Sequence, residues 1–368
     1  MRKVHEQVGH DCAVAGRISL HGAGRRRVLA GLAALAVAAS MPAVPSRVVK
    51  ARAQAAGAPP FGPWRAPLLR EHPLAGMILD TDGERPIART ALEQRLRRHA
   101  VAILGEVHDN PDHHRIQGQL LHAFAAGRGK PPAVVFEMIP ATMQQRLDSI
   151  LGVEGLDADM IFDAVRWDES GWPSRDLYRP VMEAVVALRA PVIAAGVPRA
   201  DVRKATRQGL DAVLPQARQQ QMQLGPLPRA LMEALVADIV KSHCDMIPPE
   251  VARRMSAAQR LRDAMLADGV RRGFRAQGAA VLITGNGHAR KDRAVPFYLQ
   301  RHGDVPVPLV VWQAEVRAQA TRMEELLPED ALPPRKVADV VIGTPKAERE
   351  DPCAQFERFM RRKRGGAQ

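Results

Sequence analysis

One pattern occurs twice in this 368-residue chain: an apolar run followed by Gly-x-x-His. The first copy is residues 101–104 followed by GEVH, and the second is residues 279–284 followed by GNGH. Continuous apolar runs of this length are typical of strands that are buried on both faces in a parallel sheet. Because open α/β sheets bind ligands beyond the carboxyl ends of their strands, the repeat predicts that His108 and His288 meet over one site.

Strand and helix signals alternate around these two copies. Three further strands are predicted at residues 133–136, 191–195 and 307–312. Residues 337–342 are interpreted as an edge strand, residues 175–188 as a crossover helix, and residues 162–172 as irregular. This order predicts an α/β fold with an open, mainly parallel sheet and crossover helices.

A long stretch without strand signals, residues 199–277, separates the predicted third and fourth strands. It has helical periodicity and is broken by prolines, so it is interpreted as a helical subdomain inserted into an α/β domain at residues 57–345. Its last helix is predicted at residues 249–275. Residues 346–368 are expected to form a charged C-terminal tail.

The net charge of +13 is concentrated at the two ends of the chain. Residues 1–56 carry nine Lys or Arg and two acidic residues, and residues 358–368 carry five Lys or Arg and no acidic residue. The body between them is nearly neutral, which argues against nucleic-acid binding because such a fold carries its own basic surface. The basic run at residues 361–364 is interpreted as a solvated end, with peripheral contact to anionic lipids as the alternative.

Residues 1–56 are interpreted as a twin-arginine-type signal peptide, which predicts a periplasmic or exported protein. A twin-arginine pattern at residues 24–29 precedes an apolar run that is too short to span a bilayer. A Sec signal or a disordered basic arm is the alternative. No cysteine lies near the small-residue cleavage region, so a lipid anchor is not expected. Export would leave Cys244 and Cys353, whose pairing the sequence leaves open.

Ionisable side chains follow three of the predicted strands. Glu106 and His108 follow the first strand, Glu137 the second, and His288 the strand before GNGH. Such carboxylates and imidazoles can ligate a divalent metal ion or act as general acid and base. His243 reaches over the strand ends from the helical segment in this interpretation, which completes a candidate metal set of His108, His243, His288, Glu106 and Glu137.

Other polar residues give weaker signals. His113 and His114 are neighbours on a predicted helix, so one of them must point away from any site. Gln259 and Asp263 form an i,i+4 pair that is interpreted as a solvated helix face.

The chain has two tyrosines, Tyr178 and Tyr298. Tyrosinate is a known axial ligand of ferric haem, although a tyrosine is by default a core residue with a hydrogen-bonded hydroxyl. The candidate cofactor-binding residues are therefore these two tyrosines together with His108, His243 and His288.

Five segments resemble a known family. They are LGEVHDNPDHHRIQ, VVFEMIP, WDESGWPSRDLYRPV with PVIAAGVPR, SHCDMIPPEVARRMSAAQRLRDAMLA, and ITGNGHARKDRAVPFYL. In this order, from about residue 90 to 312, the chain resembles the ChaN family, the haem-binding uptake, Tiki-like domain. The resemblance implies an exported bacterial protein that binds haem through a tyrosine for iron acquisition, in a homodimer with two haems face to face.

The resemblance also implies an alternative activity. Related Tiki-like and erythromycin-esterase-like proteins use the paired Gly-x-x-His and glutamate positions for hydrolysis, which correspond here to Glu106, His108, Glu137 and His288. We therefore expect a haem-binding protein in haem or iron uptake, with its ligand in a cleft at the strand ends. A metal-dependent hydrolase with a divalent metal ion is the alternative.

Overall fold

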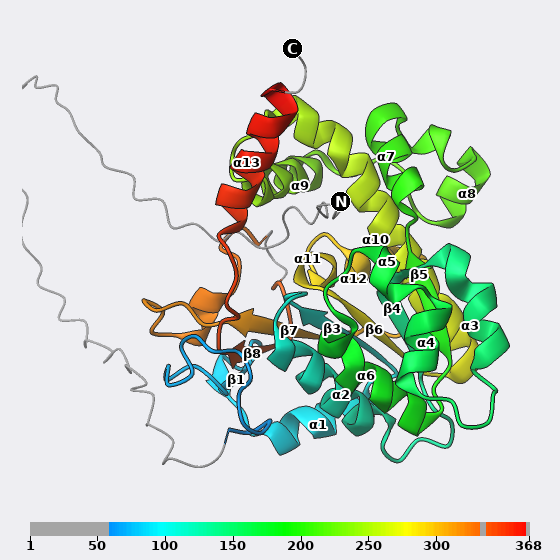
Figure 1. Ribbon diagram of the computed structural model, residues 1–368, viewed down its shortest axis with the longest axis vertical. Coiled ribbons are helices and arrows are strands. Elements are labelled where there is room, and N and C mark those ends of the chain that lie inside the picture. Colours follow the sequence, from blue (N-terminus) through cyan, green and yellow to red (C-terminus); the bar gives the residue numbers. More distant parts are fainter. Residues whose placement is uncertain (1–58, 332–335, 366–368) are drawn as a thin grey trace, which may run out of the picture. The chain divides into compact units, whose positions relative to one another are not determined.

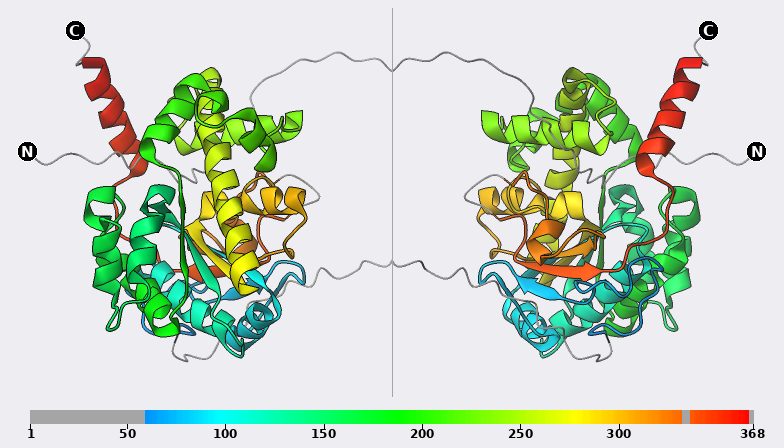
Figure 2. Two further views of the ribbon diagram at one scale, coloured as in Figure 1. Left: turned by 90° about the vertical axis from the view of Figure 1, so that its right-hand side faces the viewer. Right: turned by 90° about the vertical axis from the view of Figure 1, so that its left-hand side faces the viewer.

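The computed structural model describes residues 59–331 and 336–365. The predicted signal peptide at residues 1–56 lies outside these residues. Within them, an eight-stranded sheet lies between two layers of helices (Figures 1 and 2). None of the described helices is both long enough and apolar enough to cross a bilayer.

The sheet has the strand order β2-β1-β8-β7-β3-β6-β4-β5. Its strands are β1 (Ile78–Asp80), β2 (Arg85–Pro86), β3 (Val101–Glu106), β4 (Ala133–Pro140), β5 (Val192–Gly196), β6 (Ala280–Gly285), β7 (Leu309–Glu315) and β8 (Val340–Thr344). The six strands from β3 to β8 are parallel to one another, and the β1–β2 hairpin closes one edge by antiparallel pairing of β1 with β8. The predicted mainly parallel α/β sheet is confirmed.

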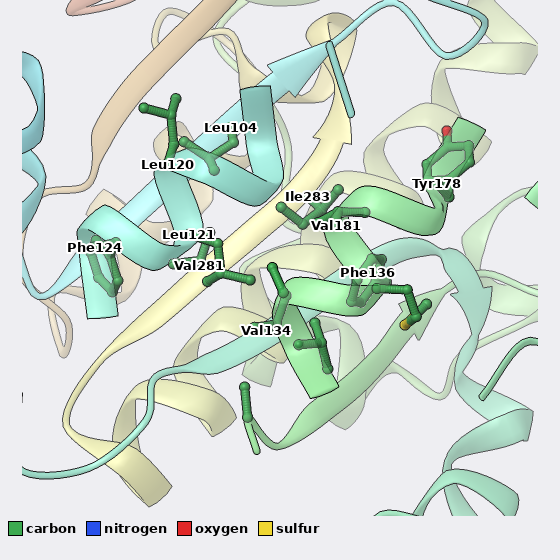
Figure 3. Close-up of a cluster of buried hydrophobic side chains, with 14 of the residues drawn as sticks. Leu104, Leu120, Leu121, Phe124, Val134, Phe136, Tyr178, Val181, Val281 and Ile283 are labelled. Atoms are coloured by element: carbon green, nitrogen blue, oxygen red, sulfur yellow. The ribbon is translucent and has the colours of Figure 1, made fainter. Parts of the chain in front are cut away.

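Alternate strand residues feed two separate apolar cores, one on each face of the sheet. One face is covered by α1 (Arg89–Arg98), α2 (Pro111–Ala125), α3 (Gln144–Ile150), α4 (Ala158–Ala164), α5 (Trp167–Ser170) and α6 (Arg175–Leu188). Figure 3 shows Leu104, Phe136 and Ile283 of three strands beside Leu121 of α2 and Val181 of α6. Burial on both faces explains why these strands are apolar throughout instead of alternating with polar residues.

The opposite face is covered by α7 (Arg199–Gln208), α10 (Pro249–Gln277) and α12 (Val295–His302). Two glycines let α10 approach the sheet closely: a methyl group on Gly269 would lie 2.7 Å from Cβ of Ala195, and one on Gly273 would lie 2.8 Å from Cβ of Ala133. Larger residues at these positions would push the helix away. The sequence of α10 therefore fixes its distance from β4 and β5, and with it the position of the polar residues that this helix carries.

Two local predictions were wrong. The strand predicted as an edge at residues 337–342 is β8, which pairs with β7 on one side and with β1 on the other. The β1–β2 hairpin that covers it was missed because its strands have only three and two residues. Residues 162–172, predicted to be irregular, contain the end of α4, a helix of seven residues, and all of α5, a helix of four residues.

Residues 199–277 are helical, and their middle part forms a small apolar cluster of its own. It is built from α9 (Arg229–Ser242), the first turns of α10, and α13 (Pro352–Gly365), which lies beside α9 in Figure 1. Phe356 of α13 packs in this cluster with Leu235 and Ile239 of α9. A disulfide between Cys244 and Cys353 joins the same elements, with a Cα–Cα distance of 5.6 Å.

We predict that this disulfide stabilises the fold. It closes a loop with a sequence separation of 109 residues, and cross-links over long loops restrict the unfolded chain most strongly. The double variant Cys244→Ser/Cys353→Ser should lose roughly 2–5 kcal/mol in free energy of unfolding, measured by urea titration. A reductant should lower the stability of the wild type and leave the double variant unchanged. Equal stability of oxidised wild type and double variant would contradict the prediction.

Candidate functional site

The two Gly-x-x-His motifs meet, as predicted, because β3 and β6 are parallel neighbours. Glu106 of β3 pairs in register with Gly285 of β6. The glycine of each motif makes room for the other motif: a methyl group on Gly285 would lie 2.6 Å from Nε2 of His108, and one on Gly105 would overlap Oδ1 of Asn286. Each glycine is therefore needed for close approach of the two strand ends.

Glu106 is a fully buried carboxylate that receives donors from three directions. Its Oε1 accepts a 2.6 Å hydrogen bond from the Tyr178 hydroxyl and a 2.8 Å hydrogen bond from Nδ1 of His108. Nδ1 of His114 lies 3.1 Å from Oε2. Burial alone would raise the pKa of Glu106, but His114 and His108 outweigh it and hold that pKa well below its usual range. Glu106 is thus ionised at the centre of the site.

His114 faces acceptors with both ring nitrogens. Nε2 lies 2.9 Å from the carbonyl oxygen of His108, and Nδ1 lies between Glu106 and Oε1 of Gln117. The amide of Gln117 donates to the carbonyl of Leu104, which turns its oxygen toward His114. The two ring nitrogens of His114 therefore connect α2 to Glu106 and to the backbone of His108.

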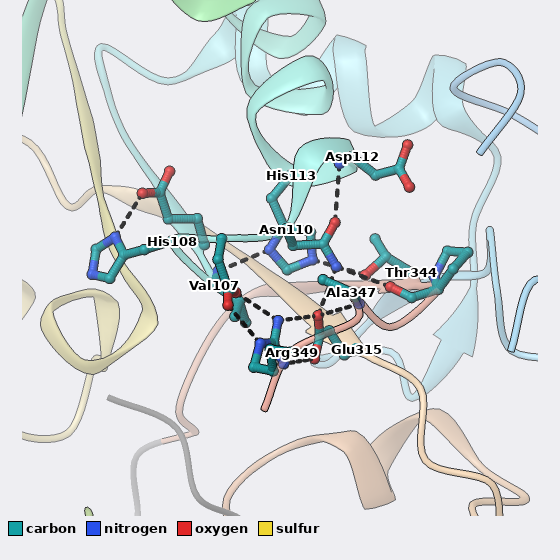
Figure 4. Close-up of polar contacts among 12 residues, drawn as sticks. Val107, His108, Asn110, Asp112, His113, Glu315, Thr344, Ala347 and Arg349 are labelled. Carbon is teal, nitrogen blue, oxygen red and sulfur yellow. Dashed lines mark hydrogen bonds and ion pairs between the residues drawn. The ribbon is translucent and has the colours of Figure 1, made fainter. Parts of the chain in front are cut away.

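His113 points toward Thr344 of β8 (Figure 4), so one member of this pair points away from Glu106, as the sequence requires. Its Nδ1 accepts from the backbone N–H of Val107 at 2.8 Å, and its Nε2 donates to Oγ1 of Thr344 at 2.8 Å. Burial lowers the pKa of His113 to about 3, so the ring is neutral at physiological pH. His113 is a structural residue that joins the start of α2 to β8.

Arg349 fixes the loop between β3 and α2 from the opposite side (Figure 4). Its guanidinium makes paired 2.6 Å hydrogen bonds to the carboxylates of Asp109 and Glu315. Glu315, at the end of β7, also accepts from the side-chain amide of Asn110, the N-cap residue of α2, at 2.8 Å. Because Asp109 is adjacent to His108, these contacts hold the backbone that carries this histidine.

Glu137 and His288 form a second carboxylate–histidine group on β4 and β6. Oε2 of Glu137 accepts from Oγ1 of Thr284 at 2.7 Å and from the N–H of Gly285 at 2.8 Å. Nε2 of His288 lies 3.3 Å from Oε1 of Glu137, and its Nδ1 lies 2.6 Å from Oδ1 of Asp263 on α10. Burial alone would lower the pKa of His288, but Glu137 and Asp263 together raise it to about 10. His288 is a buried cation between two carboxylates.

The contribution of α10 to this group was not predicted from the sequence. Gln259 and Asp263 were predicted to lie on a solvated helix face, and that prediction was wrong: Asp263 is buried, and Nε2 of Gln259 lies 3.3 Å from Nδ1 of His288. Their i,i+4 spacing was visible in the sequence, but their contact with His288 depends on the close approach of α10 to the sheet. Tyr178 was recognised only as a candidate ligand, not as the partner of Glu106.

Two further residues predicted to bind a cofactor, His243 and Tyr298, are not part of these two carboxylate–histidine groups. His243 ends α9, where its Nδ1 lies 2.7 Å from the carbonyl of Ile239 and its ring packs against Phe356. None of its contacts with described residues involves the strand-end group. Tyr298 is buried in the second core, and burial raises its pKa to about 12.

Two cofactor types can be tested against these side chains. Within residues 59–331 and 336–365, no group of three His, Cys, Asp or Glu side chains is arranged to hold a metal ion, because the strand-end carboxylates and histidines are paired with one another. For haem, Tyr178 is fully buried, and burial and Glu106 raise its pKa well above the usual value. His108 differs from its neighbours: its side chain is 15% exposed, and its ring contacts half-buried Trp172 at 4.8 Å.

The fold and the site together define a class of protein. Its members have a parallel sheet with helices on both faces and paired carboxylate–histidine groups at the strand ends. Residues 92–299, more than half of the chain, match the family described as haem-binding uptake, Tiki superfamily, ChaN. The chain belongs to this family. A comparison with curated proteins finds no significant match.

A solved structure shows the same fold. A structure of cofacial heme binding to ChaN of Campylobacter jejuni has a TM-score of 0.54 at 20% identity, covering 72% of this chain and 95% of that chain. A mutant erythromycin esterase in its open conformation has a TM-score of 0.41 at 13% identity, covering 79% of this chain and 99% of that chain.

We predict that Gly285→Ala disrupts the site, whereas Gly287→Ala does not. The new methyl group at position 285 meets the ring of His108, and overpacking of this kind costs about 1–3 kcal/mol. At position 287 a methyl group meets nothing within 4 Å. Urea unfolding should report the loss at 285, and the ring NMR signals of His108 should shift only in that variant. Equal effects of the two substitutions would contradict the contact between the motifs.

We also predict a pH dependence that belongs to His288. Its pKa is raised to about 10 in the folded state, above about 6.5 in the unfolded chain. Its contribution to stability is therefore complete below pH ~6.5 and is lost as the pH rises toward 10. The stability gap between the wild type and His288→Gln should shrink over this range, with the variant of exposed His122, His122→Gln, behaving as wild type. A gap that is constant from neutral to alkaline pH would refute the assignment.

Proposed function

We propose that this protein binds haem at the strand-end site and takes part in haem or iron handling. The family match over residues 92–299 supports haem as the ligand, and the geometry of His108 supports the place. Haem would supply an iron centre that the protein holds or passes on. The proposed binding cleft lies at the carboxyl ends of β3, β4 and β6, beside Trp172.

The observation that carries this proposal is the 2.8 Å hydrogen bond between Nδ1 of His108 and the buried carboxylate of Glu106. Histidines that ligate a metal commonly donate their other ring nitrogen to a carboxylate, which fixes the tautomer and orients the ring. Histidine is a common axial ligand of haem iron, and it ligates metals as the neutral imidazole. His108 is also the most exposed of the predicted cofactor-binding side chains at the strand ends.

A tyrosine ligand is less well supported by the geometry. Tyr178 and Tyr298 are both buried, and the pKa of each is raised, so neither hydroxyl is ready to become a tyrosinate at neutral pH. Tyr178 instead donates to Glu106. We therefore assign Tyr178 to the orientation of the Glu106–His108 pair and His108 to the haem iron.

Export and dimerisation are parts of the same proposal. The Cys244–Cys353 disulfide supports an oxidising compartment such as the periplasm, where disulfides persist. A homodimer is proposed because a cofacial pair of haems, as in the Campylobacter jejuni protein, would require two chains with one site each.

A second function, hydrolysis, is favoured by the Glu137–His288–Asp263 group, which haem ligation does not need. Several buried ionised groups at one place are costly, and such clusters are common in active sites. His108 would act as general base oriented by Glu106, and Glu137, held as a carboxylate by His288, would orient a water molecule or substrate. Because the described residues offer no metal set, this candidate uses side chains alone.

A haemin titration of the mature protein, followed by visible absorbance, separates these functions. We expect saturable binding that weakens at least about tenfold in His108→Ala, since loss of an axial ligand or of its supporting carboxylate typically costs 10–100-fold in affinity. Tyr298→Phe should bind as wild type.

Other results would change the assignment. Loss of binding in Tyr178→Phe with normal binding in His108→Ala would move the ligand to the tyrosine. Absence of saturable binding would reject the haem proposal. Ester hydrolysis that disappears in both His108→Ala and Glu137→Gln would then support the second function.

A further inference from the structure

Arg262 lies on the face of α10 that meets the strand ends. Gln259 and Asp263 of the same face contact Nδ1 of His288, and Arg262 is one residue before Asp263 and three after Gln259. The i,i+3 spacing of Gln259 and Arg262 places these two side chains on one side of the helix. The electrostatic neighbours of its guanidinium are Glu137 and Asp263, so it faces the second carboxylate–histidine group.

Unlike the neighbouring buried arginines, Arg262 has no direct partner in the described part of the chain. Arg260, two residues earlier, donates to the carbonyl oxygens of Leu224 and Gly225. Arg290 and Arg293 form ion pairs with several aspartates. Arg262 is half-buried, and burial lowers its pKa despite the two nearby carboxylates. The N–H donors of this guanidinium therefore stay available to a ligand. Burying a charged group without a direct partner costs desolvation free energy, and ligand binding would explain that cost.

The charges around Arg262 permit an anion to bind. Glu137 and Asp263 are two acidic groups, and His288 and Arg262 are two cations, so this half of the site is balanced. In the other half, the Tyr178 hydroxyl and the ring nitrogens of His108 and His114 surround the carboxylate of Glu106. An incoming carboxylate or phosphate therefore meets little net repulsion, and it finds a planar fork that suits bidentate pairing.

We propose that Arg262 is the anion-binding residue of the strand-end site and holds a carboxylate or phosphate group of the ligand. The inference rests on the proposed function only in placing the ligand at the strand ends, and it limits the ligand to molecules that carry such a group. A haem propionate is one carboxylate of this kind.

The test uses acetate and inorganic phosphate as probes, without haem, at constant ionic strength. Anion binding is followed by the ring NMR signals of His108 and His288. At least one anion should shift these signals in a saturable way, and Arg262→Gln should weaken binding by about tenfold or more, as expected for a charge-assisted hydrogen bond. Arg262→Lys should be intermediate, because it keeps the charge and loses the fork. Arg254→Gln removes the same charge from an exposed position of α10 and should bind as wild type.

Thermal unfolding separates this role from a structural one. Because Arg262 has no direct partner among the described residues, Arg262→Gln should unfold at or above the wild-type temperature. The bound anion should raise the unfolding temperature of the wild type and not that of the variant. Wild-type anion affinity in Arg262→Gln, or no response to either anion in the wild type, would overturn the proposal. The haem proposal is judged separately, since haemin can bind through His108 whether or not Arg262 binds anions.

Discussion

The buried carboxylate of Glu106 is the constraint on which the site depends. An ionised carboxylate away from water is costly unless several donors surround it. Here the donors come from the loop after β3, from α2 and from α6, as His108, His114 and Tyr178. These contacts require fixed positions of α2 and α6 against the sheet. The orientation of His108 therefore depends on how the helices on this face pack, through their shared contacts with Glu106.

The two histidines of the repeated motif consequently have different environments and different roles. The ring of His108 is oriented by the carboxylate of Glu106, and its side chain is 15% exposed. His288 lies between Glu137 and Asp263, is almost fully buried and holds a proton up to about pH 10. A permanently charged ring is a poor ligand and a poor base. His288 therefore acts by keeping Glu137 ionised, and chemistry belongs to the side of His108.

The sequence predicted the features that follow from local pattern. The buried strands and the clustering of Glu106, His108, Glu137 and His288 at strand ends follow from apolar runs that end in polar residues. It could not predict which elements supply their partners. Asp263 is 126 residues after Glu137 and reaches His288 only because two glycines let α10 lie close to the sheet. Contacts of this kind depend on helix spacing, which no local pattern encodes.

Haem binding and hydrolysis make the same demand on His108, which is a fixed and neutral ring. The Glu106–His108 pair therefore cannot by itself distinguish the two functions. The second group can, because an axial histidine needs no further ionised carboxylate beyond its own partner, whereas a hydrolytic base uses one to orient water. Both proposed functions place a ligand at His108, close to Glu137. In our proposal Arg262 of α10 selects a ligand that carries an anionic group, and the Glu106–His108 pair after β3 supplies the chemistry.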